Sequence, residues 1–195
     1  MTDDRPLVER AKRGDMDAFR RLVESSMTKV YWIAYDLTGS RRDAEDLSQD
    51  VFLKAFHSLD SFRGDAKWST WLYRITVNTC LDYLKSPARK RMQLDNPTSD
   101  DGLPRNVDFH EPLTPDRITE SRMIQVNIER ALDSLSPQER SVFVLRHYHD
   151  LPLKQIADTL SVAEGTVKSY LFRAIHSLQK ELGFYRNEFG LEEKP

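Results

Sequence analysis

The chain has 195 residues, of which 39% are hydrophobic and 31% are charged, and its formal net charge is −2. This length fits one domain or two small ones, and the modest apolar share favours small helical units with much exposed surface. The single cysteine, Cys80, excludes an intramolecular disulfide and a cysteine-based zinc cluster. The sequence contains no long apolar run and no basic-then-apolar leader, so we expect a soluble, cytoplasmic protein without membrane insertion.

Charge is distributed unevenly along the chain. Residues 1–92 hold 17 lysines and arginines against 14 acids, residues 93–121 hold 2 against 7, and residues 122–195 hold 10 against 10. The near-neutral total therefore conceals a basic front and an acidic middle. The middle segment has four of the nine prolines and no helical periodicity, which indicates a linker. It is either a plain spacer or one whose acidity mimics nucleic acid in a basic channel.

Apolar residues of the first block recur at three- and four-residue steps, the pattern of amphipathic helices. Gly and Asp residues interrupt this pattern and indicate breaks between helices. The expected helical stretches are a short face over 7–11, a long helix over 18–34, a stripe over 44–59 and a fourth helix over about 68–84. The expected breaks are Gly14-Asp15, Gly39-Ser40 and the loop 61–65.

An acidic stretch opens the third of these helices. Asp43, Asp46 and Asp50 are spaced so that their carboxylates share one helix face. Neighbouring like charges are mildly destabilising, so a compensating partner is expected: a divalent metal or a basic protein surface. The plainer alternative is acids favoured by the helix dipole, which suits Asp50 least. The metal alternative needs a second carboxylate cluster, and none is evident in the sequence.

Aromatic and cationic side chains alternate over residues 62–91. This combination suits unpaired bases, which stack on aromatic rings while cations hold the phosphates. The alternative is a helix whose aromatic residues are buried in the ordinary way. The residues concerned are Phe62, Arg63, Lys67, Trp68, Trp71, Tyr73, Arg74, Tyr83 and Lys85.

The last block has the pattern of a helix-turn-helix. Ser136, Pro137 and Glu139 form a capping box that starts one helix, and Asp150-Leu-Pro152 ends it. A short helix over 153–160 and a turn over 161–163 precede a longer helix from Glu164. In such a motif the second helix enters the major groove, and its outward side chains contact base edges. Those side chains are Lys168, Ser169, Phe172 and Arg173. The alternative is an ordinary three-helix unit with solvated charges.

Taken together, these stretches resemble the extracytoplasmic-function group of bacterial sigma-70 factors over nearly the whole chain. The resemblance lies in Asp43-Ala-Glu-Asp-Leu-Ser-Gln-Asp-Val-Phe-Leu-Lys-Ala-Phe56, Phe62-Arg-Gly-Asp65, Trp71-Leu-Tyr-Arg-Ile-Thr-Val-Asn78, Leu135-Ser-Pro-Gln-Glu-Arg140 and Glu164-Gly-Thr-Val-Lys-Ser169. The order and spacing of these motifs are specific. The last motif alone is weaker, because two-component response regulators carry a similar helix-turn-helix.

The resemblance implies an all-α protein with two small helical domains: sigma-2 at 1–92 and sigma-4 at 122–195, joined by a flexible linker at 93–121. Sigma-2 would bind the clamp of the largest polymerase subunit and capture a flipped base of the −10 element near Phe62. The implied polymerase contacts are Asp43, Asp46, Gln49, Asp50 and Phe52. The implied −10 contacts are Phe62, Arg63, Lys67, Trp68, Arg74 and Asn78.

Sigma-4 would read the −35 element through Lys168, Ser169, Phe172 and Arg173 and would contact the flap of the second polymerase subunit. The resemblance further implies a linker that threads toward the polymerase active-site channel, and an anti-sigma factor that holds the protein inactive. Where that factor is a membrane protein, the chain would be held at the inner membrane. No catalytic residue, metal or cofactor is implied.

Two other functions stay open at this stage. One is a dimeric operator-binding regulator, which would need a ligand or receiver domain. The other is an all-α phosphohydrolase with a metal on Asp43, Asp46 and Asp50. One departure from the family pattern concerns Ala163, where many members have a serine that caps the recognition helix; Ser161 or solvent would have to replace it.

Overall fold

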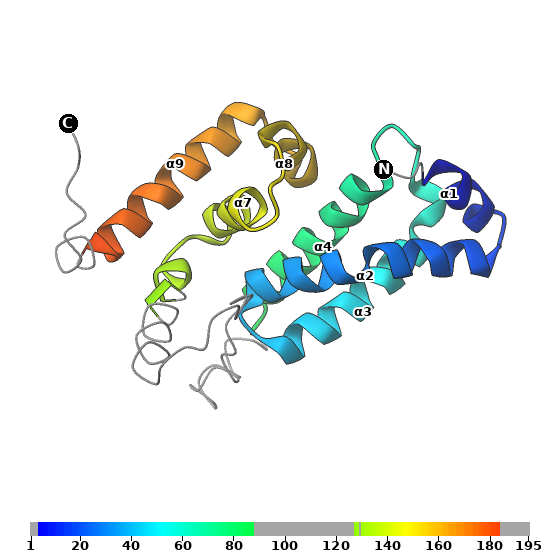
Figure 1. Ribbon diagram of the computed structural model, residues 1–195, viewed down its shortest axis with the longest axis horizontal. Helices are drawn as coiled ribbons and strands as arrows, with labels where there is room; N and C mark the ends of the chain where they lie inside the picture. The colour runs from blue at the N-terminus through cyan, green and yellow to red at the C-terminus, as the bar shows by residue number, and fades with distance from the viewer. Residues whose placement is uncertain (1–3, 88–126, 129, 184–195) are drawn as a thin grey trace, which may run out of the picture.

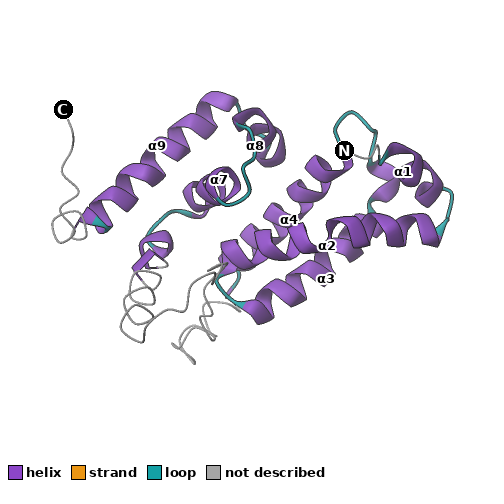
Figure 2. Ribbon diagram, in the orientation of Figure 1, coloured by secondary structure: helices purple, strands orange, loops and turns teal. Residues whose placement is uncertain are grey.

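The computed structural model describes residues 4–87, 127–128 and 130–183, and within these ranges all regular secondary structure is helical (Figures 1 and 2). The expectation of an all-α protein with two small helical domains is thereby confirmed. The predicted linker 93–121 lies outside the described residues. The first domain contains α1 Arg5–Lys12, α2 Met16–Thr38, α3 Arg41–His57, the short 3-10 helix η1 Leu59–Ser61 and α4 Trp68–Lys85. The second contains α7 Pro137–His147, α8 Leu153–Leu160 and α9 Glu164–Glu181.

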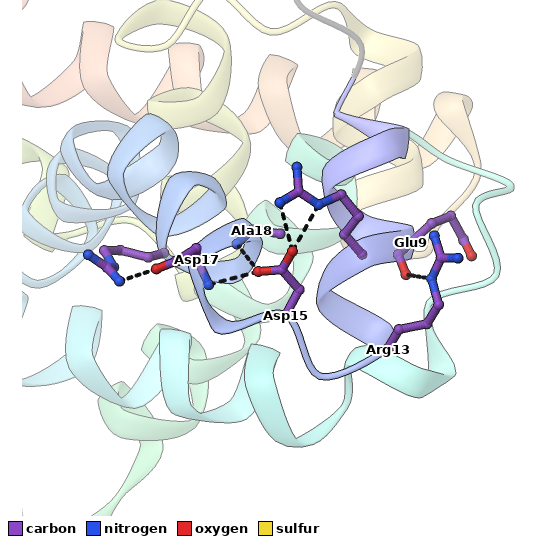
Figure 3. Close-up of polar contacts among 7 residues, drawn as sticks. Glu9, Arg13, Asp15, Asp17 and Ala18 are labelled. Carbon is purple, nitrogen blue, oxygen red and sulfur yellow. Dashed lines mark hydrogen bonds and ion pairs between the residues drawn. The ribbon is translucent and has the colours of Figure 1, made fainter.

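The break predicted at Gly14-Asp15 is a capped helix start (Figure 3). One carboxylate oxygen of Asp15 accepts the backbone N–H groups of Asp17 and Ala18, both at 3.0 Å, which otherwise lack partners in the first turn of α2. The other oxygen accepts Arg10 Nε at 2.9 Å. Asp15 thus connects the end of α1 to the start of α2.

The second predicted break, Gly39-Ser40, is a tight corner. Gly39 has a left-handed backbone with φ of 73°, and its N–H donates to the Tyr35 carbonyl at 2.7 Å. A side chain at this φ would strain the backbone, which accounts for glycine here. The next residue, Ser40, caps α3 by accepting the Asp43 N–H at 3.2 Å. The chain therefore reverses within two residues, and α3 packs against α2.

Two apolar clusters hold the first domain, and one of them continues into the second. The cluster confined to the first domain joins α1, α2, α3 and α4 around residues such as Leu22, Val51 and Leu72. The larger cluster contains Ile33 and Leu37 of α2 together with Leu145 and Ile156 of the second domain. The two domains therefore share a core, in which α4 packs against α8 and α2 packs against α7 (Figure 1).

The helices of the second domain begin and end close to the boundaries that the sequence predicts. The capping box at α7 is complete: Ser136 Oγ accepts the Glu139 N–H at 3.3 Å, and Glu139 accepts the Ser136 N–H at 3.1 Å. Pro152 precedes α8. Ser161, at the end of α8, has a left-handed backbone with φ of 56°, and it is followed by the turn into α9.

The sequence analysis missed a helical stretch before α7. Residues 127, 128 and 130–133 are helical, and Ala131, Leu132 and Leu135 pack with Ala174 and Leu178 of α9. Apolar residues recur at three- and four-residue steps in this segment, a pattern that predicts a helix. The stretch matters because it supports the rear of α9.

The N-terminal cap of α2 should contribute a pH-dependent part of the stability. The pKa of Asp15 lies below its usual value of 3.8, chiefly because the carboxylate accepts the Ala18 N–H and also because Arg10 is beside it. A depressed pKa in the folded state stabilises the fold above 3.8, and this stabilisation is lost as the pH falls below that value. Asp15→Asn keeps the cap but loses the charge. We expect its melting temperature to lie below that of the wild type at neutral pH and the difference to shrink below pH 3.8. A difference that stays constant in acid would contradict this role of the charge.

The recognition helix should be stabilised by a better cap. Ala163 occupies the N-cap of α9 with an extended backbone, and no side chain caps this helix. Ser161 does not replace the missing cap, because it ends α8 instead. Ala163→Ser should stabilise the fold by about 1 kcal/mol and raise the melting temperature by roughly 2–4 °C in a scanning calorimeter. Ala163→Val is the control, since valine cannot accept the hydrogen bond; an equal gain there would refute the capping explanation.

Candidate functional site

The first candidate surface is the outer face of α3. Its inner face is buried through Ala44, Leu47 and Val51, which leaves Asp46, Gln49 and Asp50 exposed. Two other predicted residues differ: Asp43 is partly buried in the first turn, and Phe52 packs against the core of the first domain. The sequence-predicted set therefore divides into three exposed polar residues and two that are partly buried.

The same face of α3 carries apolar side chains that the sequence analysis did not single out as site residues. Leu53 is 58% exposed and Phe56 is 41% exposed, and both continue the line of Asp46, Gln49 and Asp50 at three- and four-residue steps. Phe56 also meets Phe19 of α2 edge-on, with ring centroids 5.1 Å apart. Apolar side chains grouped on an exposed helix face are compatible with a protein-binding surface. We call Asp46, Gln49, Asp50, Leu53 and Phe56 the α3 stripe.

The acidic residues of α3 do not assemble a metal site with other described residues. Across residues 4–87, 127–128 and 130–183, no group of three or more His, Cys, Asp or Glu side chains is arranged to hold a metal ion. Asp43 differs in exposure from Asp46 and Asp50. The second carboxylate cluster that the metal alternative requires is therefore absent from the described residues.

The second candidate surface is the loop before α4. The five residues from Arg63 to Lys67 are all exposed, while the aromatic residues on either side, Phe62 and Trp68, are 5% and 3% exposed. Their ring centroids lie 6.1 Å apart, and Trp68 Nε1 donates to Ser26 Oγ at 3.2 Å. The loop is therefore anchored at both ends, and the anchors place the cations of Arg63 and Lys67 on the surface.

The predicted −10 contacts differ in how exposed they are. Phe62 and Trp68 are packed in the core, so in this conformation their rings are not open to stacking by a base. Their role in base capture stays a prediction, and the structure gives them a packing role. On α4 itself, Arg74 and Asn78 are one helical turn apart, and both are exposed. The open part of this surface thus consists of the loop cations and the outer face of α4.

The third candidate surface is the outer face of α9. Val167, Ala174 and Leu178 are buried, so the opposite face presents all four predicted residues to solvent, among them Phe172 with 73% exposure. The sequence analysis did not include His176, which is exposed one turn beyond Phe172; the two rings are stacked with centroids 6.4 Å apart. His176 lies at i+4 from Phe172, and this spacing places both residues on one helix face, so the sequence could have predicted it.

Arg173 is oriented by contacts from its own helix and from α7. Its Nε donates to the Ser169 carbonyl at 3.3 Å, and its guanidinium lies over the Tyr170 ring at 5.0 Å. Glu139 Oε1 is 3.5 Å from Arg173 Nε, while the other oxygen of Glu139 is engaged in the capping box. Lys168, by contrast, pairs with Glu164 on its own helix at 3.0 Å. The two cations of α9 are therefore held in different ways.

Comparison with known families identifies both domains. The family model for sigma-70 region 2 matches residues 22–90, and the model for region 4 matches residues 125–178. These matches contain the α3 stripe and the loop before α4 in the first case, and the helix-turn-helix of α8 and α9 in the second.

Curated relatives match over nearly the whole length. The chain is 31% identical to the RNA polymerase sigma-H factor of Pseudomonas aeruginosa over 186 residues, covering 92% of this chain and 93% of the relative. It is 33% identical to the ECF RNA polymerase sigma-E factor of Escherichia coli (92% and 94% covered) and 30% identical to the ECF factor SigW of Bacillus subtilis (90% and 94% covered). The chain belongs to the extracytoplasmic-function group of the sigma-70 family.

Solved structures agree on the fold. CnrH, solved in complex with the cytosolic domain of CnrY, superposes with a TM-score of 0.64 at 24% identity, covering 93% of this chain and 98% of that one. The sigma factor RpoE of Bartonella quintana, solved with the anti-sigma factor NepR, gives 0.62 at 23% identity, with 85% and 96% covered.

Family membership settles the general function. The chain is a sigma factor that binds core RNA polymerase and directs it to promoter DNA, as the resemblance implied. The family consists of transcription factors, which disfavours both the operator-binding regulator and the phosphohydrolase. None of the helices in the described ranges has the length and apolar character needed to span a membrane.

Proposed function

We propose that this sigma factor has no catalytic chemistry of its own and works in the cytoplasm through three surfaces. The α3 stripe docks on the clamp of the largest polymerase subunit, the loop before α4 together with Arg74 and Asn78 contacts the −10 element, and α9 reads the −35 element. The observation that carries this assignment is the outer face of α9, where the predicted −35 residues are all exposed on the second helix of a helix-turn-helix.

We further propose the domain limits 1–92 and 122–195, with the acidic segment 93–121 as the linker that follows the polymerase channel. In support, the region 2 and region 4 matches fall inside the two proposed domains and leave the acidic segment uncovered. Regulation by an anti-sigma factor is part of the proposal, because the sigma factor RpoE was solved in complex with one. The proposed contact of the second domain with the polymerase flap rests on the family resemblance.

Reconstitution with polymerase tests this function. The purified full chain is mixed with sigma-free core polymerase and genomic DNA in the absence of any anti-sigma factor, and the transcripts are sequenced from their 5′ ends. We expect a small set of defined start sites that share two upstream elements. Absence of specific initiation by a chain with a normal helical circular-dichroism spectrum would contradict the proposal.

The α3 stripe should bind polymerase through both its acids and its apolar residues. Asp50→Ala removes a charge and Leu53→Ala removes a side chain that is 58% exposed in the free chain. We expect each to weaken core binding about tenfold, which corresponds to about 1.4 kcal/mol. Fluorescence anisotropy with labelled sigma measures the affinity.

The matched control is Glu24→Ala, which removes an exposed acid from α2 away from the stripe. Its affinity should equal that of the wild type. Equal affinity for Asp50→Ala would favour the simpler explanation, in which the acids of α3 merely complement the helix dipole.

Arg173 should contribute to −35 recognition without affecting polymerase binding. A good side-chain contact to a base edge discriminates by about 1–3 kcal/mol, so Arg173→Ala should lower transcription from a cognate promoter about tenfold or more. Lys180→Ala is the control, since Lys180 is exposed two turns further along the same helix. Run-off transcription and core affinity are measured together; a parallel loss of core affinity would overturn the assignment to DNA.

A further inference from the structure

One acidic side chain of α7 lies between the start of its own helix and the recognition helix. Glu139 Oε2 accepts the Ser136 N–H at 3.1 Å and the Ser136 hydroxyl at 2.7 Å, so the carboxylate is held at the start of α7. Its other oxygen, Oε1, lies 3.5 Å from Nε of Arg173 on α9. The Glu139 side chain is 17% exposed, whereas that of Arg173 is 57% exposed. A largely buried anion therefore faces a cation that extends to the surface.

The contacts of Arg173 leave one edge of its guanidinium open. Nε donates to the Ser169 carbonyl at 3.3 Å and faces Glu139, while Cζ lies 5.0 Å from the centre of the Tyr170 ring. In the described part of the chain, no hydrogen bond engages either Nη group. Two Nη groups can donate to O6 and N7 of one guanine, the commonest specific contact of arginine with a base. The Nε side is thus held by the protein, and the Nη edge remains for a base.

Of these three partners, only Glu139 comes from outside α9. Ser169 and Tyr170 lie within one turn of Arg173, so they move together with it. Glu139 belongs to α7, which packs against α9 and whose first turn is closed by the capping box. The carboxylate of Glu139 therefore fixes the guanidinium relative to the rest of the second domain.

The capping role and the pairing role of Glu139 can be separated. They use different oxygens of the carboxylate, and glutamine completes a capping box as glutamate does. Glu139→Gln therefore keeps the cap of α7 and removes the anion that faces Arg173. Because an ion pair with an exposed partner contributes little to folding, we expect the variant to melt at nearly the wild-type temperature.

We propose that Glu139 is a positioning residue for −35 recognition, which holds the Nε side of Arg173 so that the Nη edge is presented to one base pair. This inference rests on the proposed function of α9. A long side chain that is already held in place loses less conformational freedom when it binds. Loss of the Glu139 charge should therefore weaken discrimination at the base pair that Arg173 reads and at no other.

Promoter preference of the holoenzyme tests this inference. Core polymerase is combined with the full-length chain or a variant, and each position of the −35 element of a promoter found by reconstitution is varied singly. Counting the transcripts gives the preference at each position. We expect Glu139→Gln to reduce preference about two- to tenfold at the position where Arg173→Ala reduces it, and to leave the other positions unchanged.

The matched control is Asp158→Asn, which removes an exposed acid from α8 of the same helix-turn-helix. It should leave every preference unchanged, since a change of charge alone acts on the phosphates of all sequences alike. In the Arg173→Ala background, Glu139→Gln should have no further effect, because a positioning residue acts through the residue that it positions. A further loss in that background, a loss spread evenly over the −35 positions, or unchanged preference in Glu139→Gln would overturn the proposal.

Nuclear magnetic resonance of the free full-length chain measures the position of Arg173 without DNA. The Nε–H resonance of Arg173 is identified by its absence in Arg173→Ala, and its hydrogen exchange should be faster in Glu139→Gln than in the wild type. Unchanged exchange would overturn the proposal. Unchanged preferences in Arg173→Ala itself would instead refute the −35 assignment, and this failure is distinguishable because the exchange measurement needs no promoter.

Circular dichroism checks that Glu139→Gln is folded. If its helical signal is lost, Glu139→Asp is measured in its place with the same expectations. Aspartate keeps the charge, but its side chain is one methylene shorter, which withdraws the carboxylate from Arg173. Wild-type preference and wild-type exchange in that variant would overturn the proposal.

Discussion

The carboxylate of Asp36 is the point on which the relation between the two domains depends. Small helical domains bury a limited share of their apolar surface, and here each domain uses the other to cover what it leaves exposed. The cluster that contains Ile33, Leu37, Leu145 and Ile156 is continuous across the interface. An apolar interface alone tolerates sliding, whereas directional polar contacts fix one orientation: the buried Asp36 carboxylate lies 2.8 Å from His149 Nε2, and the Asp36 main-chain carbonyl accepts Arg140 Nε and Nη2 at 3.3 and 3.2 Å. Asp36 therefore supplies specificity to a contact whose strength comes from apolar burial.

This division between inner and outer faces also explains where function resides. In α3 the buried arc of Ala44, Leu47 and Val51 leaves the opposite arc for the α3 stripe, and in α9 the buried Val167 and Ala174 leave the opposite arc for DNA. The modest apolar share of the chain follows from this use of both faces. Likewise, the net charge of −2 does not argue against DNA binding, because the acids of residues 93–121 offset the basic first domain.

Local patterns in the sequence predicted the helices well, but they did not predict contacts between residues far apart in the chain. Gly39 and Pro152 marked their boundaries because each acts on its own backbone within a residue or two. For Phe62 the sequence left burial and base stacking open as alternatives, because the outcome depends on how Trp68 and Trp71 pack around it. The pairing of Asp36 with His149 was inaccessible, because no periodicity connects residues 113 apart.

The geometry of α9 shows how a binding surface is organised by a neighbouring helix. This helix begins without a side-chain cap, so its own first turn does little to fix the recognition face. Besides the contacts of Arg173 with its own helix, part of its orientation comes from Glu139, whose carboxylate closes the capping box of α7 with one oxygen and faces Arg173 with the other. Because the same carboxylate serves both, the start of α7 and the position of the Arg173 guanidinium are coupled. A recognition helix that lacks a side-chain cap can thus stay preorganised, provided that the helix packed against it is capped.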